Sequence, residues 1–430
     1  MKHRKITSSP AMGVWSATSI GVGAMIGAGL FALIGIAVEI AGQEAWLAFV
    51  VAGIAAFLTA YSVAKLATRY PSKGGRVTFF NEGYGKGVFA GALNIIMWIG
   101  YMIVTALYAR AFGEYSLALL GMDGDSIWLH VFCSAVVIFF VFINFLGAAV
   151  VGASELLIVA IKVLILLVFG ILGLTTMNVE QIAITHEFDF AALVLASGVI
   201  FTAYEGFGLV ANTAEDIENP RSNLPRALFF SITIVMMIYL LVNFAVIGNL
   251  SIESIINAKE FALAEAAKPI MGSLGFTIMG LAALFSTSSA INATLYGPVY
   301  MLQETAKAGQ ISPFFIQSLF KRESGRALLI TGLMVLLVSN LLDLGSIAET
   351  GSLIFLLIYT AVNIANFKLR RQTASNPFIV MLGIVATGLI FSTLIYYLIL
   401  EADLSIYLFM AILVTGFLYQ WFYQKHRRSF

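Results

Sequence analysis

Charged residues are scarce in this chain. Lysine, arginine, aspartate and glutamate make up 11% of the 430 residues, whereas hydrophobic residues make up 60%. The mean hydropathy is +0.95. An ordinary soluble domain has about 25% charged residues, so this composition excludes that class of protein. The net charge of +1 gives no reason to expect a nucleic acid as a partner.

Residues that bind metals or form cross-links are also few. Cys133 is the single cysteine, which excludes an intramolecular disulfide, and there are four histidines. The sequence has no phosphate-binding loop of the GxxxxGK[ST] type and no visible nucleophile constellation. We therefore expect no metal, no other cofactor, no ATP-driven pumping by this chain alone and no enzyme activity.

Apolar runs of membrane-spanning length occupy most of the sequence. Twelve such runs lie at residues 11–41, 44–67, 87–118, 127–148, 152–177, 191–213, 225–249, 271–299, 327–344, 346–367, 377–400 and 404–424. The polar connections between them are too short for a sizeable soluble domain. The sequence therefore predicts an all-α, polytopic membrane protein with twelve transmembrane helices, surrounded by lipid.

The positions of the basic residues predict the orientation, because lysine and arginine accumulate in short cytoplasmic loops. With both termini inside, most of the 24 lysines and arginines fall in cytoplasmic segments. Only Lys259 and Lys268 then lie in outside loops. We expect a multi-pass protein of the cell membrane with cytoplasmic N- and C-termini.

Two apolar runs are interrupted at corresponding places. Glycines recur between residues 21 and 31 of the first run, and a Tyr-Glu-Gly sequence interrupts residues 201–208 of the sixth. An unwound stretch within a bilayer survives only where it is buried in protein or lines a cavity, because each unsatisfied backbone polar group in lipid costs several kcal/mol. Interrupted helices at matching positions of two halves indicate the midplane site of a secondary transporter.

At these interruptions the sequence resembles the amino acid–polyamine–organocation (APC) permeases, and in particular their proton-dependent branch. The matching segments are GAMIGAGLF at 23–31, AYEGF at 203–207, EDIENPRSNLPR at 215–226 and ALFSTSSAINA at 283–293. The resemblance implies the leucine-transporter fold, with helices 1 and 6 unwound halfway. Residues 1–180 and 181–370 would form inverted repeats of five helices, and residues 371–430 would add two helices.

An amino acid substrate needs a receptor for its carboxylate and one for its ammonium, and the ends of half-helices supply both. Glycine permits a close approach of the backbone to a ligand. The expected carboxylate donors are the backbone N–H groups of Ile26, Gly27, Ala28 and Gly29. The alternative is that these small residues only let helices pack closely.

The resemblance also implies ammonium acceptors and a gate. Freed carbonyls near residues 21–24 and 201–204, the latter including Ala203 and Tyr204, would bind the ammonium. An aromatic residue of helix 6 would cover the substrate from outside, and Phe201 is our choice. On the cytoplasmic side, Arg69, Arg76 or Arg226 would pair with the acidic residues of 215–218, unless these charges are only solvated.

Lys162 lies midway along the fifth apolar run, where an insertion cost of roughly 2.5–3.5 kcal/mol marks a functional residue by default. By resemblance, its ammonium would occupy a pocket lined by the Gly23 carbonyl and the Ser286 hydroxyl. Burial disfavours the charged form, which makes proton release and proton coupling plausible. The alternative is a permanently charged lysine that only holds three helices together.

Glu205 departs from the resemblance, since relatives often carry an apolar or small polar residue there. If its carboxylate faces the substrate, a cationic amino acid or an amine is favoured. The alternative is a carboxyl bonded to neighbouring helices and turned away from the cavity. Glu205 is therefore included among the substrate-site residues without deciding the substrate.

These observations favour a proton-coupled symporter of amino acids that works by alternating access. The alternative within transport is an exchanger of amino acids or polyamines without proton coupling. A sensor would be expected to carry a soluble output domain, which the sequence lacks.

Overall fold

The computed structural model describes residues 12–122, 127–146, 152–183, 189–319 and 324–427. The regular structure in these ranges is helical, apart from an isolated parallel bridge between Met12 and Ile217 and a single bridge residue at Leu319. The terminal basic residues that contribute to the predicted orientation, such as Lys2 and Arg428, lie outside the described ranges.

The first part of the chain forms seven α-helices in its described residues. They are α1 (Val14–Met25), α2 (Ala28–Ala41), α3 (Ala45–Arg69), α4 (Arg76–Tyr84), α5 (Val88–Leu120), α6 (Ile127–Leu146) and α7 (Gly152–Thr176). Short 3₁₀ turns follow α2 at Gly42–Glu44 and α7 at Val179–Ile182.

A long 3₁₀ helix marks the second part. The elements are α8 (Phe190–Val199), η4 (Ile200–Thr213), α9 (Pro220–Ile247), α10 (Ile252–Ala258), α11 (Ala262–Lys307), α12 (Gly325–Leu341), α13 (Leu344–Lys368), α14 (Arg370–Thr373), α15 (Pro377–Leu400) and α16 (Leu404–Arg427). Further 3₁₀ turns lie at Lys259–Phe261 and Pro313–Ile316. By length and composition, ten helical segments of the described ranges can cross a membrane, and Val14–Met25 and Gly325–Leu341 are shorter apolar helices.

Local chemistry accounts for several helix ends. The Asp189 carboxylate accepts hydrogen bonds from the first N–H groups of α8, and the Asp343 carboxylate accepts one at the start of α13. Asn219 has φ 45°, and Pro220 follows it as the first residue of α9, where a missing N–H has no consequence. Gly121 ends α5 in the left-handed conformation that glycine favours.

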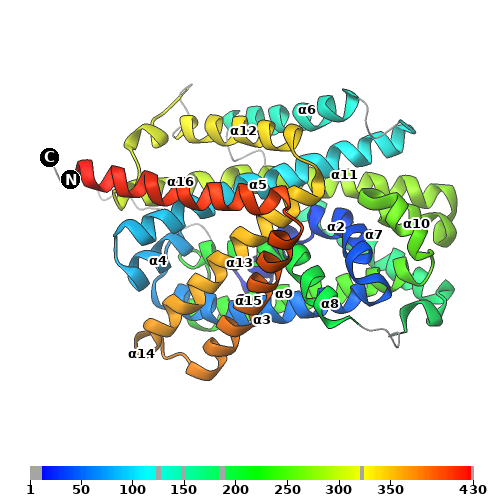
Figure 1. Ribbon diagram of the computed structural model, residues 1–430, viewed down its shortest axis with the longest axis horizontal. Helices are drawn as coiled ribbons and strands as arrows, with labels where there is room; N and C mark the ends of the chain where they lie inside the picture. The colour runs from blue at the N-terminus through cyan, green and yellow to red at the C-terminus, as the bar shows by residue number, and fades with distance from the viewer. Residues whose placement is uncertain (1–11, 123–126, 147–151, 184–188, 320–323, 428–430) are drawn as a thin grey trace, which may run out of the picture.

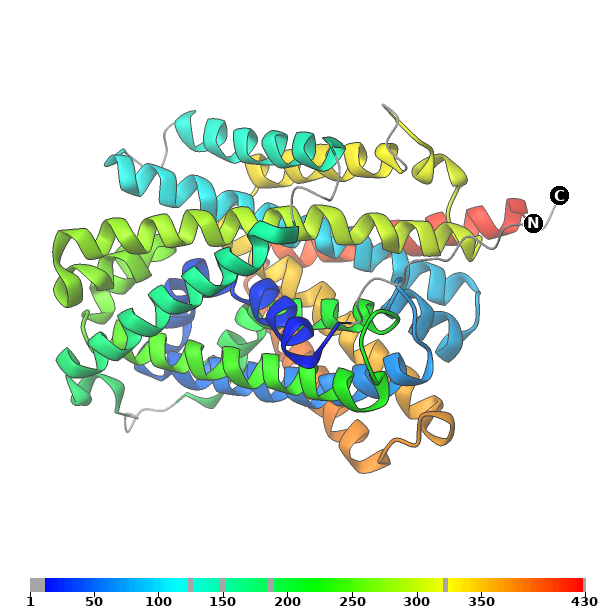
Figure 2. The same ribbon diagram turned by 180° about the vertical axis from the view of Figure 1, so that it is seen from behind.

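The helices are packed around a central pair of interrupted segments. In Figures 1 and 2, α5 and α11 run along the long axis, and α6 and α12 form an outer layer on them. The segment α2 and the C-terminal end of α1 lie inside the bundle, where they contact η4, and α9 packs against α1. Every residue of η4 except Leu209 and Asn212 is buried. The two interrupted segments therefore meet in the most enclosed part of the fold.

Candidate functional site

The first predicted interruption is a break in the helix between α1 and α2. Ile26 has ψ 69°, and Gly27 has φ −108° and ψ −141°, so both leave the helical conformation. The Ile26 N–H donates to the Val22 carbonyl at 2.9 Å, and the Gly27 N–H donates to the Met25 carbonyl at 2.8 Å. The N–H groups of Ala28 and Gly29 begin α2, so no carbonyl within that helix accepts them.

The second interruption differs from the expectation of an unwound helix. It is a continuous 3₁₀ helix of 14 residues, η4, and runs of this type longer than about four residues are uncommon. A mid-helix 3₁₀ stretch often marks a hinge or strain. The expectation that this segment is unwound is therefore wrong. The chain changes its hydrogen-bond pattern here but stays helical.

Glycines let the two interrupted segments touch backbone to backbone. A Cβ on Gly206 would lie 2.4 Å from the Ala24 carbonyl carbon, and a Cβ on Gly29 would lie 2.6 Å from the Ala203 Cα. Both distances are far below van der Waals contact. The glycine pattern that predicted unusual backbone thus serves a close approach of α1 and α2 to η4.

Hydroxyl groups from other helices bond the carbonyls at these interruptions. The Tyr239 hydroxyl of α9 lies 2.7 Å from the Met25 carbonyl and 2.9 Å from the Ala203 carbonyl. The Ser352 hydroxyl of α13 donates to the Val199 carbonyl at 2.7 Å. An ammonium that approached the Ala203 carbonyl would therefore compete with Tyr239.

Lys162 joins α7 to the end of α1 and to the break that follows it. Its Nζ donates to the Gly23 carbonyl at 2.8 Å and to the Ile26 carbonyl at 2.5 Å, and its side chain is 1% exposed. The Ser286 hydroxyl of α11 also donates to the Ile26 carbonyl, at 2.7 Å. A Cβ on Gly23 would lie 2.6 Å from Val159, so glycine lets α7 approach α1 closely. The structure thus brings Lys162, Gly23 and Ser286 together at the helix break.

Glu205 forms a buried ion pair with Arg76. Two guanidinium nitrogens donate to Glu205 Oε1, each at 3.0 Å. The Arg76 side chain is 3% exposed and that of Glu205 is 1% exposed. Arg76 also donates to the hydroxyls of Tyr359, at 2.8 Å, and Tyr101. The Glu205 carboxylate is therefore directed toward α4, α5 and α13.

Sequence reasoning missed this partner. The sequence predicts that Arg76 lies on the cytoplasmic side and pairs with the acidic residues of 215–218, but in the structure it is buried against Glu205. The ion pair found at that acidic segment is Lys73 with Asp216, at 3.7 Å and half-exposed. The Gly74-Gly75 pair before Arg76 permits the turn that buries it, since Gly75 has φ 48° and its Cβ would lie 2.1 Å from Asn212, but two adjacent glycines do not by themselves indicate a buried arginine.

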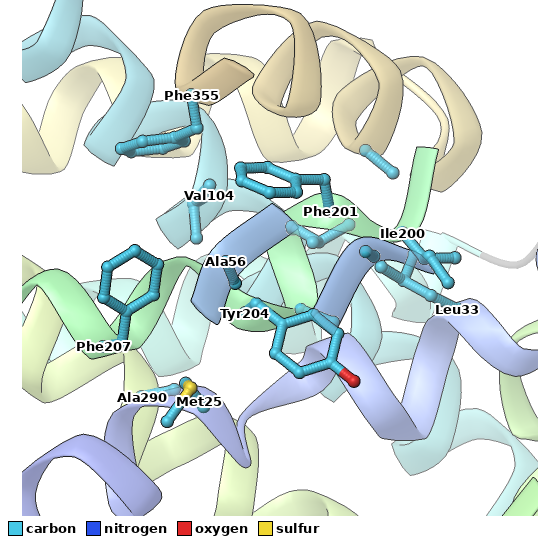
Figure 3. Close-up of a cluster of buried hydrophobic side chains, with 14 of the residues drawn as sticks. Met25, Leu33, Ala56, Val104, Ile200, Phe201, Tyr204, Phe207, Ala290 and Phe355 are labelled. Atoms are coloured by element: carbon cyan, nitrogen blue, oxygen red, sulfur yellow. The ribbon is translucent and has the colours of Figure 1, made fainter. Parts of the chain in front are cut away.

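Aromatic side chains enclose the same region. Phe201 meets Tyr359 edge to face, with ring centroids 5.9 Å apart, and Phe207 stacks on Tyr359 at 4.9 Å. Figure 3 shows Phe201 beside Phe355, whereas Tyr204 points away from them. The Tyr204 hydroxyl donates to the Phe49 carbonyl at 2.9 Å. Ile26, Phe201, Ala203, Tyr204 and Glu205 are all at most 2% exposed, so this arrangement is closed.

Cavities lie at both ends of the closed region. One of about 810 Å³ is bordered by the end of α3 and the start of α9, and its basic lining includes Lys65, Arg69 and Arg221. Another of about 790 Å³ is bordered by the end of α2 and the start of α8, and its lining includes Glu39 and Asp189. The break between α1 and α2 lies between these two ends.

Comparisons with known proteins identify the family of the chain. The model of the family described as amino acid permease matches residues 12–427. An uncharacterized protein of Methanocaldococcus jannaschii, MJ0609, is 36% identical over 99% of this chain and 96% of its own length. The inner membrane transport protein YbaT of Escherichia coli is 32% identical over 90% of each chain. The serine/threonine exchanger SteT of Bacillus subtilis is 29% identical over 65% of this chain and 64% of its own length.

This family match agrees with the many apolar helices and indicates a membrane transporter. Such proteins are multi-pass membrane transporters rather than enzymes, and their substrates are amino acids or related small molecules. The chain therefore belongs to the amino acid permeases of the APC superfamily.

Proposed function

We propose that this permease is a proton-coupled amino acid symporter that works by alternating access around the α1–α2 break. The observation that carries the proposal is the Lys162 ammonium, which is buried against the Gly23 and Ile26 carbonyls. A charged Lys162 holds α7 to the break, as a bound cation would. Loss of its proton removes the charge and one donor, which loosens the contact between α7 and α1.

The substrate is proposed to bind where the two interrupted segments meet. The N–H groups of Ala28 and Gly29 suit a carboxylate because they begin α2 without a side-chain cap. Ile26 and Gly27 complete the turn, and their N–H groups would contribute only after release from the carbonyls that they now bond. The enclosure would be completed by η4, which contributes its neighbouring carbonyls, the side chains of Phe201 and Tyr204, and the backbone of Glu205.

The proposed architecture is the leucine-transporter fold with twelve membrane spans. In it, residues 1–180 and 181–370 form inverted repeats, and residues 371–430 supply the last two spans and a cytoplasmic C-terminus. Several contacts support this orientation. The Lys65 ammonium donates to the Ala374 carbonyl, and Tyr70 bonds Gln372, so segments with many basic residues meet at one end of the bundle. We propose that this end faces the cytoplasm of a cell-membrane protein.

Uptake into proteoliposomes tests the function. Wild-type protein is expected to accumulate alanine or serine when an inward proton gradient is imposed and to take up far less without one. Lys162→Met removes the titrating group but keeps a long apolar side chain, so its uptake should lose the dependence on the gradient. Lys307→Met is the matched control, since Lys307 is 67% exposed and paired with Glu304 at the end of α11. Wild-type uptake that is the same with and without the proton gradient would overturn the proposed proton coupling.

An exchanger of amino acids or polyamines is the second candidate, because one relative is named as a serine/threonine exchanger. In that case uptake requires substrate inside the vesicle. Transport that depends on internal substrate, and that Lys162→Met leaves unchanged, would replace the symporter with an exchanger.

A further inference from the structure

The surroundings of Glu205 form a complete cation site. Around the Arg76 guanidinium carbon lie the rings of Tyr359, Tyr101 and Phe355, with centroids at 5.2, 5.4 and 6.0 Å. Cations are attracted to the faces of such rings, most strongly where water is excluded. The carboxylate adds the opposite charge at 3.0 Å. This combination of one carboxylate and three aromatic rings would suit the ammonium or guanidinium of a cationic substrate.

The chain's own Arg76 fills this site. Its nitrogens donate to Glu205 and to the hydroxyls of Tyr101 and Tyr359, and the Tyr359 hydroxyl donates to the Glu205 backbone carbonyl at 3.0 Å. A Cβ on Gly208 would lie 2.8 Å from the Arg76 guanidinium, so glycine leaves the room that the guanidinium needs. Gly75, with its positive φ, lets the chain turn α4 inward at this point.

The position of this pair relates it to the substrate. Glu205 precedes Gly206, whose backbone touches Ala24 and Met25 at the α1–α2 break. A negative charge on Glu205 would therefore act on any molecule held at the break, because Coulomb interactions are strong where water is excluded. With Arg76 in place, the pair carries no net charge.

A tethered guanidinium is difficult for a free cation to displace. Arg76 is held by a buried ion pair and two hydroxyl acceptors, and separating such a pair leaves an uncompensated buried charge. Its covalent attachment to α4 also gives it a high effective concentration at the site. A substrate with a second positive charge would find the carboxylate already occupied.

We propose that Arg76 is a built-in counter-charge that makes the permease select amino acids without net charge and reject cationic ones. This inference rests on the proposed amino acid transport and names its substrate class. It requires Glu205 to remain paired while substrate is bound. Removal of Arg76 should expose the carboxylate and its aromatic rings and admit lysine or arginine.

The test measures uptake of alanine, serine, lysine and arginine by the full-length protein in proteoliposomes. Wild type is expected to prefer the neutral pair at least ten-fold. Arg76→Gln should lower this ratio at least ten-fold through a gain of lysine and arginine uptake. The double variant Arg76→Gln/Glu205→Gln should regain the neutral preference, and Arg76→Lys should keep it. Arg371→Gln, which removes an exposed arginine of α14, is the matched control.

The possible outcomes distinguish a failure of the proposed selectivity from a failure of amino acid transport itself. Wild-type uptake of lysine or arginine at the neutral rate, or an unchanged ratio in Arg76→Gln, would overturn the inference while leaving amino acid transport intact. Absence of uptake of all four amino acids by wild type would instead overturn the proposed function on which the inference rests. If Arg76→Gln fails to fold, uptake of lysine or arginine at the neutral rate by wild type, or by the double variant, which carries no unpaired charge, would still overturn the inference.

Discussion

At the scale of single residues, side-chain hydroxyl groups bond backbone carbonyls of the interrupted segments and join them. Tyr239 lies within hydrogen-bond distance of carbonyls on both interrupted segments, at Met25 and Ala203. Its side chain is fully buried, so no water can take its place at these carbonyls without a rearrangement. One residue of α9 therefore joins α1 to η4.

Replacing this hydroxyl should weaken the fold. Tyr239→Phe keeps the ring but removes the buried hydroxyl that bonds the Met25 and Ala203 carbonyls, which should cost about 1–3 kcal/mol of stability. Thermal unfolding of the purified protein in detergent would show a lower midpoint. Tyr407→Phe, at a tyrosine that is 61% exposed, is the control and should leave the midpoint unchanged. Equal midpoints for Tyr239→Phe and wild type would show that the hydroxyl does not hold the two segments together.

Single residues also show what the sequence can predict. Lys162 was identifiable because a lysine amid apolar neighbours has few reasons to be there other than function. The resemblance places its ammonium at the Gly23 carbonyl and the Ser286 hydroxyl; the structure has the contact with Gly23, but the second acceptor is the Ile26 carbonyl, to which Ser286 also donates. Its coupling role stays a prediction. Arg76 was not identifiable, because a basic residue near a helix end is already explained by membrane topology.

At the scale of elements, the contact between α1 and η4 depends on the absence of side chains at a few positions. Gly206 contacts the backbone at Ala24 and Met25, which cannot move aside as a flexible side chain could. The glycine clusters predicted unusual backbone, and the break at Ile26 and Gly27 confirms it for the first segment. The 3₁₀ form of the second was not predictable, because its partners lie far away in the sequence: Tyr239 bonds the Ala203 carbonyl, and Ser352 accepts from the Thr202 N–H.

Adding one methyl group at this contact should separate the elements. Gly206→Ala would place its Cβ 2.4 Å from the Ala24 backbone, and such overpacking typically costs about 1–3 kcal/mol. We expect a lower thermal midpoint and slower uptake. Gly388→Ala in α15 has nothing within 4 Å of the new Cβ and should be neutral or slightly stabilising. The same midpoint for both variants would contradict the proposed close contact.

At the scale of the whole molecule, the order and approximate bounds of the apolar helices could be predicted from hydropathy alone. Their arrangement could not, because apolar surfaces that face lipid and those that face another helix look alike in sequence. The buried η4 and the exposed face of α15 are both apolar, for example, yet only the first lies at the centre of the bundle. The orientation in the membrane stays a prediction.

Single cysteines can determine that orientation, since Cys133 is buried and can be replaced to give a background without accessible thiols. Ser222→Cys at the start of α9 and Ser254→Cys in α10 are both at exposed positions. In intact cells, a membrane-impermeant maleimide should label Ser254→Cys only. Ser222→Cys should react only after the membrane is permeabilised. The reverse pattern would place the basic end of the bundle outside and contradict the proposed topology.

The central claim is that amino acids and protons move together through a switch at Lys162. A membrane potential would then assist uptake by roughly 2.3 kcal/mol per proton for each 100 mV. The most direct measurement follows the internal pH of proteoliposomes that contain a trapped pH-sensitive dye while alanine is added outside, with no imposed gradient. We predict that wild type acidifies the interior on addition of alanine and that Lys162→Met does not. Alanine entry without any change of internal pH in wild type would contradict the claim.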